Sequence, residues 1–309
     1  MLADIAQARR WQVPRSSTSS ASCVSELSIA GWEFGTPGEN KPIVMLSHAN
    51  GMCGATWALV ARLLTDDFHV FALDARGHGD SSHLQVPEDY HWDLFVADLV
   101  NVTQQVLVET GQHSVALGVG SSFGGIVTAG AQAAHGQLFE QIVMLDPPIH
   151  PTADIIAALG LAMLAEESGM RGQLVEQTLR RRAIWKSRDE ARSAWQHKPL
   201  FAAWDPAAFE LYLQEGMGDL PDGQVALKCP PEVEAHIFRT TGSLGVLDYA
   251  PGVQVPVHLI RAGKGFFPED FLRRIAALFP QGNFEQLAGG HLLPLEVPEL
   301  VAQYLLTRS

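Results

Sequence analysis

The chain has 309 residues, of which 47% are hydrophobic and 18% charged, and its formal net charge is −13 at pH 7. This composition is typical of a globular protein large enough for one domain with an insertion or for two modest domains. The excess of acidic residues argues against binding to nucleic acid and against attachment to anionic lipid, because both need a basic surface.

The first residues contain arginines but no apolar stretch of the kind that a secretory signal needs. We therefore expect residues 1–22 to form a flexible N-terminal tail, which becomes rich in serine and threonine. Cysteine occurs three times, at Cys23, Cys53 and Cys229, without paired or metal-type spacing. Sparse, unpaired cysteines favour a reducing compartment, so we expect a cytoplasmic protein.

Beyond the tail, short apolar runs alternate with segments of helical period. Residues 24–34 alternate in polarity around Gly31 and predict a hairpin of two short strands. The following predicted strands are 43–46, 68–73, 114–119, 142–145, 257–260 and 284–287, and the predicted helices are 56–64, 92–109, 123–134, 271–278 and 298–306. Strands that alternate with helices indicate an α/β protein with a mainly parallel twisted sheet and helices on both faces.

This alternation is interrupted between residues 149 and 252, which are mostly of helical character and contain no clear strand. The simplest interpretation is a sheet domain formed by 23–148 and 253–309, with a helical insertion at 149–252. The longest apolar run, 155–165, has eleven residues. It is too short to cross a bilayer, so we expect no membrane span.

A serine between glycines follows one of the predicted strands. Gly120, Ser122 and Gly124 form a G-x-S-x-G motif, whereas Ser121 lacks glycines at the same offsets. A sharp turn from strand to helix holds such a serine in a strained backbone geometry and exposes its hydroxyl at a helix N-terminus, so the flanking positions must be small. A glycine-rich dinucleotide loop is the competing interpretation, but its third glycine position is Phe123 here.

Three further segments make the motif specific. They read MLSHANGMCGATW (45–57), LDARGHGDS (73–81) and AGGHLLPLEVPE (288–299). With these motifs in this order, the chain resembles the α/β-hydrolase family over about residues 24–148 and 253–309. The resemblance implies an α/β-hydrolase fold in which Ser122 is the nucleophile, His291 is its base, and the insertion is the family's variable helical cap.

The acid that partners this histidine needs a separate argument. In most members of the family it follows the strand predicted at 257–260, but this chain has Gly265 at the expected position. The family has a second location, directly after the strand that follows the nucleophile's helix, and Asp146 stands there. Residues just beyond the carboxyl ends of strands line the site in open α/β sheets. We therefore assign Asp146 as the acid, with Asp270 or Glu269 as the alternative.

The resemblance implies acyl transfer to water. His291 would take the proton of Ser122 while the hydroxyl oxygen attacks a carbonyl carbon, and Asp146 would orient the imidazole. The backbone N–H groups of Asn50 and Phe123 would form the oxyanion hole, with the side chain of Asn50 as a candidate further donor.

The predicted cap should decide the choice of substrate. Its aromatic residues, Trp185 and Trp204 among them, favour a small apolar ester or a related carbonyl compound, although they would equally suit the core of the cap itself. His48, which we expect chiefly to shape the oxyanion loop, is a further candidate for substrate contact. Residues 180–182 are three arginines in an acidic chain and are most simply a solvated helix face.

Several activities share this set of residues. The leading hypothesis is a serine esterase, but a carbon–carbon bond hydrolase, a thioesterase or an acyltransferase would use the same triad. An epoxide hydrolase or dehalogenase of the usual type is disfavoured, because those members carry aspartate where this chain has Ser122. The alternative outside enzymes is a ligand-binding receptor on the same fold. No metal and no organic cofactor is implied, and we expect a monomer or homodimer.

Overall fold

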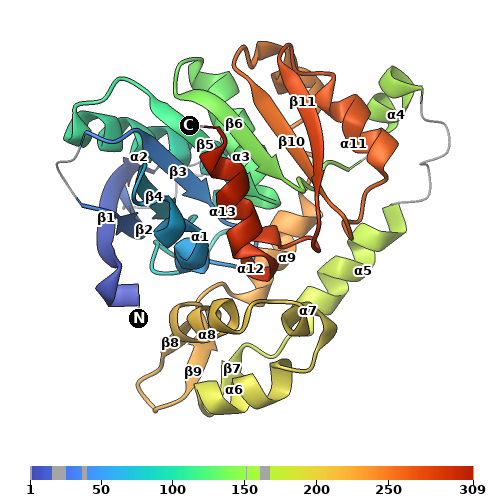
Figure 1. The fold of residues 1–309 in the computed structure, drawn as a ribbon. Coiled ribbons are helices and arrows are strands. Elements are labelled where there is room, and N and C mark those ends of the chain that lie inside the picture. The colour runs from blue at the N-terminus through green and yellow to red at the C-terminus, as the bar shows by residue number, and fades with distance from the viewer. Residues whose placement is uncertain (1, 16–25, 37–39, 151, 161–167, 309) are drawn as a thin grey trace.

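A computed structural model describes residues 2–15, 26–36, 40–150, 152–160 and 168–308. Its centre is an eight-stranded sheet in the order β1-β2-β4-β3-β5-β6-β10-β11 (Figure 1). The six strands from β4 to β11 in this order are mutually parallel, and β2 is antiparallel to both of its neighbours. The strands are β1 (Ala6–Pro14), β2 (Glu26–Phe34), β3 (Ile43–Ser47), β4 (His69–Leu73), β5 (Val115–Ser121), β6 (Phe139–Leu145), β10 (Val257–Ala262) and β11 (Gly282–Leu287).

Helices cover both faces of this sheet, and a cluster of buried apolar side chains fills the space on each face (Figure 1). One face carries α1 (Ala58–Leu64), α12 (Leu293–Glu296) and α13 (Pro298–Leu306), and the other carries α2 (Trp92–Thr110), α3 (Phe123–His135) and α11 (Glu269–Ala276). The central strands are apolar along their whole length because both of their sides are buried. The predicted fold class is thereby confirmed.

The N-terminal prediction is wrong where the structure describes it. Residues 6–14 form β1 at the edge of the sheet instead of a flexible tail, and they pair antiparallel with the whole of β2. Trp11 and Val13 point into the core while Arg10 and Gln12 are exposed, so the alternation of a half-buried strand decides the structure. The predicted Ser/Thr-rich end of the tail and Cys23 lie outside the described residues.

The predicted hairpin at 24–34 is also wrong, because residues 26–34 form the single strand β2. Gly31 is not a turn residue. A Cβ atom at this position would lie 2.6 Å from the carbonyl oxygen of Ala72 in β4. The glycine therefore permits close packing within the sheet.

The insertion contains helices and, against the prediction, a small antiparallel sheet in the order β7-β9-β8. It lies mostly below the main sheet in Figure 1, and α4 lies apart from the rest beside α11. Its elements are α4 (Ala153–Leu159), α5 (Ser168–Leu179), β7 (Ile184–Trp185), α6 (Arg188–Trp195), α7 (Pro199–Ala202), α8 (Pro206–Glu215), β8 (Met217–Asp219), β9 (Val225–Leu227), α9 (Pro231–Arg239) and α10 (Val246–Tyr249). Strands of two or three residues are too short to leave a readable period in the sequence.

Short 3₁₀ helices complete the described chain at Leu2–Asp4, Gly54–Trp57, Pro87–Tyr90 and Ala250–Gly252. The long apolar run at 155–165 belongs to α4 as far as Leu159, and its last five residues lie outside the described residues. None of the described helices combines the length and the apolar composition that a membrane span needs.

Candidate active site

Ser122 occupies the sharp turn between β5 and α3. Its backbone has φ +52° and ψ −120°, a strained geometry for a residue with a side chain, and its N–H donates to the carbonyl oxygen of Leu145 at 2.8 Å. The neighbouring glycines make the turn possible. A Cβ at Gly120 would lie 2.2 Å from the carbonyl carbon of Gly124, and one at Gly124 would lie 2.3 Å from the oxygen of Ser47.

The structure brings the three predicted site residues into one chain of hydrogen bonds. The Oγ of Ser122 lies 2.9 Å from Nε2 of His291, and Nδ1 of His291 lies 2.7 Å from Oδ2 of Asp146. A carboxylate only accepts, so Nδ1 carries the proton and Nε2 is free to accept from the serine hydroxyl. Asp146 is fully buried, and its other oxygen accepts the N–H of Ala262 at 2.9 Å.

Asp146 directly follows β6 and has a positive φ of +46°, which aspartate tolerates better than most residues. Its own N–H donates to the oxygen of Ile260 at 2.7 Å, which fixes the backbone between two parallel strands. The alternative acids are elsewhere. Glu269 and Asp270 lie in the first turn of α11 and pair with Arg273 and Arg274, which follow four residues later in each case.

The backbone of the loop that carries His291 is hydrogen-bonded to a carboxylate that the motifs did not single out. Glu296 in α12 accepts the N–H of Gly290 at 2.6 Å and the N–H of Leu292 at 3.2 Å. These bonds fix the backbone on both sides of His291. Because Glu296 binds backbone N–H groups and not particular side chains, no residue pattern in the sequence points to it.

Asn50 lines the same cavity as Ser122, and Phe123 follows the serine in the chain. Neither the N–H of Asn50 nor that of Phe123 has an acceptor among the described residues, and Phe123 begins helix α3. The side chain of Asn50 is already engaged, because its amide donates to the main-chain oxygen of Glu234 at 3.0 Å. This bond uses one of the two amide hydrogens and ties the loop after β3 to α9, so a role as a further oxyanion donor stays a prediction.

A cavity of about 700 Å³ contains Ser122 and His291. Its walls come from the loops of the sheet and from the insertion, which contributes Trp185, Trp195 and Phe201, whereas Phe266 follows β10. The ring of Phe266 is 69% exposed and its centre lies 5.0 Å from that of His291. Most of these residues are distant in the sequence from the motifs, so only folding brings them to the site.

Two of the three predicted substrate contacts are wrong, since His48 and Trp204 do not line this cavity while Trp185 does. His48 is buried and accepts the N–H of Ala75 at 2.9 Å, while its other nitrogen donates to the oxygen of Ala49 at 2.8 Å. Burial lowers the pKa of His48 to about 4, so it is a neutral support of the loop. Trp204 packs in the aromatic core of the insertion.

The loop after β4 is braced by buried polar groups. Asp74 accepts the N–H of Gly54 at 2.6 Å and that of Asp80 at 2.9 Å. Arg76 is fully buried and binds Asp98 through two hydrogen bonds of 2.6 and 2.7 Å. These contacts fix the geometry of the loops beside the site, because each buried charge has a partner.

The two described cysteines, Cys53 and Cys229, are unpaired and buried. Burial raises the pKa of both thiols, which keeps them protonated and therefore poor nucleophiles. The serine is thus the only one of these groups with a base in contact.

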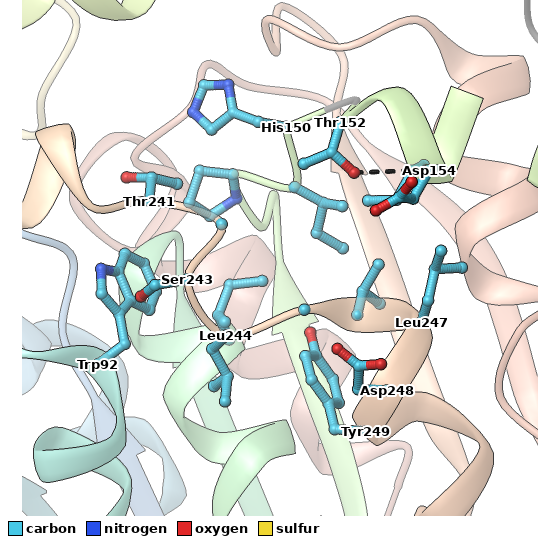
Figure 2. Close-up of a pocket in the computed structure, with 17 residues that line it drawn as sticks. Trp92, His150, Thr152, Asp154, Thr241, Ser243, Leu244, Leu247, Asp248 and Tyr249 are labelled. Carbon is cyan, nitrogen blue, oxygen red and sulfur yellow. Dashed lines mark hydrogen bonds between the residues drawn. The ribbon is translucent and has the colours of Figure 1, made fainter. Parts of the chain in front are cut away.

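Figure 2 shows the residues around a second cavity, whose volume is about 320 Å³. It is lined by residues between 148 and 155, by Trp92 of α2 and by the segment 241–249. Figure 2 shows Thr152, whose hydroxyl accepts the N–H of Ile155 at 3.3 Å and caps α4. Neither Ser122 nor His291 borders this cavity, so the chemistry belongs to the larger one.

Fold and site together are typical of a hydrolase with a serine at a strand-to-helix turn of a mostly parallel sheet. A family model described as "Alpha/beta hydrolase family" matches residues 43–304. The chain belongs to the alpha/beta hydrolase family.

Individual relatives match over shorter stretches. Epoxide hydrolase A of Mycobacterium tuberculosis is 32% identical over 124 residues, which are 40% of this chain and 36% of that protein. The pimeloyl-[acyl-carrier protein] methyl ester esterase of Vibrio atlanticus is 31% identical over 102 residues, which are 33% of this chain and 35% of that one. The chain spans only between 33% and 39% of the length of the curated relatives it matches.

Among solved structures, E-2-(acetamidomethylene)succinate hydrolase superposes with a TM-score of 0.74 at 15% identity and covers 97% of this chain and 98% of its own. At this identity the likeness concerns the fold. The two chains thus share their fold over 97% of this chain.

Proposed function

We propose that this protein is a serine hydrolase that cleaves carboxylic esters through an acyl-enzyme, with Ser122 as nucleophile, His291 as base and Asp146 as acid. The observation that carries the proposal is the chain of hydrogen bonds from Ser122 through His291 to Asp146, with separations of 2.9 and 2.7 Å, at the wall of a cavity of about 700 Å³. A serine hydroxyl is a weak nucleophile by itself and needs a base in contact that is in turn oriented by a third group.

In the acylation step, the Oγ of Ser122 forms a bond to the ester carbonyl carbon while its proton passes to Nε2 of His291. The negative charge that develops on the carbonyl oxygen is received by the backbone N–H groups of Asn50 and Phe123. Asp146 stabilises the imidazolium through its bond to Nδ1 and does not itself take the proton. His291 then returns its proton to the departing alcohol oxygen as the ester bond breaks.

Deacylation repeats these steps with water. His291 takes a proton from the water, the hydroxide oxygen attacks the acyl carbon, and Ser122 leaves with the proton that His291 gives back. Water is consumed, and one acid and one alcohol are released. The same residues would serve a thioester or a carbon–carbon bond, so the choice of bond depends on the rest of the cavity.

The family and the names of the relatives support a hydrolytic reaction. One relative is an esterase of a methyl ester. Another is an epoxide hydrolase. The position of Ser122 favours the ester reaction, because epoxide hydrolases of the usual type carry aspartate at the nucleophile position.

We also propose that the insertion 149–252 acts as the cap over this reaction. The support is that its residues form a large part of the cavity wall, with Trp185, Trp195 and Phe201 among them. Its aromatic core is continuous with the apolar cluster on one face of the main sheet. A cap anchored in this way can exclude water and select the acyl group while the catalytic residues stay on the sheet.

Fluorophosphonate labelling tests the proposal, since this reagent modifies serines that a neighbouring base activates. We expect one adduct on Ser122, located by peptide mass spectrometry, and none in the Ser122→Ala variant. Ser121→Ala is the matched control, because the Ser121 hydroxyl is buried and has no partner among the described residues. A folded protein without an adduct, or an adduct elsewhere, would contradict the proposal and favour a ligand-binding receptor.

A further inference from the structure

The cavity at Ser122 has a charge opposite to that of the whole protein. The formal net charge of the chain is −13, yet the residues that line the cavity include Arg180, Arg181, Arg182 and Lys198 against one carboxylate, that of Glu234. Arg180 and Arg182 in the basic stretch 180–182 are exposed, as the sequence suggested, but the stretch lies beyond the end of the helix and also lines the cavity. It follows α5 and forms part of the wall beside the catalytic residues. Basic groups in a cleft raise the local concentration of anions.

Three of the four cations already have a carboxylate partner. Arg181 pairs with Glu234, and Arg180 lies 3.1 Å from Glu176. Arg182 makes two hydrogen bonds of 3.0 Å to Glu190. Pairing within the protein offsets the charge of these arginines, so they add little attraction for a second anion.

Lys198 is different. Its side chain is exposed, and within the described part of the chain its ammonium group has no hydrogen-bond or ion-pair partner. Lys198 directly precedes α7 and lines the same cavity as Trp195 and Phe201. One unpaired positive charge matches one carboxylate better than a phosphate dianion.

A second unsatisfied donor lies in the same wall. Trp185 lines the cavity and is only 6% exposed. Its indole N–H is buried and has no acceptor among the described residues. The guanidinium of Arg182 covers its ring, with 4.1 Å between the guanidinium carbon and the ring centre. An indole nitrogen only donates, so an anionic or carbonyl oxygen that reached this nitrogen would satisfy an unpaired buried donor.

The remaining wall is apolar and open. Leu174, Leu200 and Phe266 line the cavity and are 41%, 51% and 69% exposed, which is unusual for side chains of this size. They would bury their surface against an apolar part of a bound molecule. The cavity thus combines an apolar surface, an activated serine and one free positive charge.

We propose that the substrate is an ester whose acyl part carries a terminal carboxylate, and that Lys198 binds this carboxylate. The inference rests on the proposed esterase function and adds the class of the acyl group. The apolar side chains hold the hydrocarbon part between the reacting carbonyl at Ser122 and the carboxylate at Lys198. Lys198 is a specificity-determining residue and takes no part in the bond-breaking steps.

Two esters with the same acyl chain test this. They are 4-nitrophenyl hydrogen suberate, which has a free terminal carboxylate, and methyl 4-nitrophenyl suberate, in which that carboxylate is blocked. We expect kcat/KM to be about tenfold higher for the free acid than for the blocked ester, because the free acid can form a charged hydrogen bond to Lys198. Lys198→Gln should remove this preference, chiefly through KM, because it lowers kcat/KM for the free acid about tenfold more than for the blocked ester.

Lys186→Gln is the matched control, because Lys186 lies in the same basic region but does not line the cavity. It should retain the preference for the free acid. Equal kcat/KM for the two esters in the unaltered protein, or an equal loss of preference in the Lys186→Gln variant, would overturn the inference.

Binding separates this inference from the proposed function. In the Ser122→Ala variant, calorimetry with suberic acid monomethyl ester measures affinity without turnover. Affinity that falls about tenfold on adding Lys198→Gln would support the carboxylate site even if no ester were hydrolysed, and in that case only the esterase function would fail. Affinity that is independent of Lys198 would overturn the carboxylate site whatever the rate of hydrolysis.

Discussion

Gly265 lies against the carboxylate of Asp146: a Cβ atom at Gly265 would be 2.5 Å from Oδ1 and 2.7 Å from Oδ2. In most members of the family that the sequence resembles, the catalytic acid stands at the position of Gly265, after the strand that is β10 here. In this chain the carboxylate reaches the same place from the end of β6. The two positions compete for one volume beside His291, so an acid at one requires a small residue at the other.

This relationship predicts the effect of Gly265→Ala. The added methyl group has no room unless the carboxylate of Asp146 moves away, and a shift of about 1 Å in a catalytic group can cost about a hundredfold in rate. We expect kcat to fall between about 10- and 100-fold with little change in KM, measured with a 4-nitrophenyl ester. Gly263→Ala is the control, because its nearest neighbour would be the oxygen of Leu287 at 3.4 Å, an ordinary contact. A Gly265→Ala variant as active as Gly263→Ala would show that the packing does not limit the carboxylate.

A second prediction concerns Asp146 directly. Asp146→Asn would present an amide to Nδ1 of His291 and favour the tautomer in which Nε2 carries the proton and cannot accept from Ser122. We expect kcat to fall by about 10⁴-fold in a variant that keeps its circular dichroism spectrum. Asp270→Asn, which removes only an exposed partner of Arg274, should keep full activity. Loss of activity in Asp270→Asn with normal turnover in Asp146→Asn would reverse the assignment.

A third prediction follows from the lowered pKa of His48. Its pKa is about 4 in the folded protein because burial disfavours the charged ring, against 6.5 ordinarily. The unfolded chain therefore binds the proton more readily. The resulting stabilisation of the folded state is complete above pH 6.5 and is lost as the pH falls through about 4. At about 1.4 kcal/mol per pKa unit, this loss is about 3 kcal/mol in the free energy of unfolding.

Urea unfolding at several pH values measures this effect. In His48→Gln the free energy of unfolding should be lower at pH 7, because a buried hydrogen bond is lost, but it should fall less steeply between pH 6.5 and 4. The exposed His197 is the control, and His197→Gln should keep the pH dependence of the unaltered protein. An unchanged slope in His48→Gln would mean that other groups, such as the buried His78, account for the acid sensitivity.

A fourth prediction separates a buried from an exposed ion pair. Asp98→Asn removes the charge that balances Arg76, which is fully buried, and we expect a loss of about 3–5 kcal/mol in the free energy of unfolding. Glu176→Gln removes the partner of Arg180, where the two side chains are 68% and 77% exposed, and the loss should stay below about 1 kcal/mol. Comparable losses in the two variants would contradict the view that burial decides the value of these pairs.

From β3 onward the sequence alone determined how strands and helices alternate along the main domain, and it determined the place of the serine turn. Both depend on local patterns: apolar runs predict the buried strands, and Gly120 and Gly124 are required by a turn that no side chain fits. The resemblance carried by its motifs singled out His291 and the location of Asp146, and the rule that residues beyond the carboxyl ends of strands line the site supported Asp146. The sequence missed β1, whose alternation around Trp11 and Val13 has meaning only once β2 lies beside it.

Only the tertiary structure decided which side chains surround the serine. Lys198, Phe266 and the arginines 180–182 come from segments with no motif, and they meet because the insertion folds back over the ends of the strands. The same holds for Gly265, whose need to be small is set by a carboxylate 119 positions earlier in the chain. A sequence records backbone geometry locally, but a cavity is formed by distant residues whose contacts depend on packing.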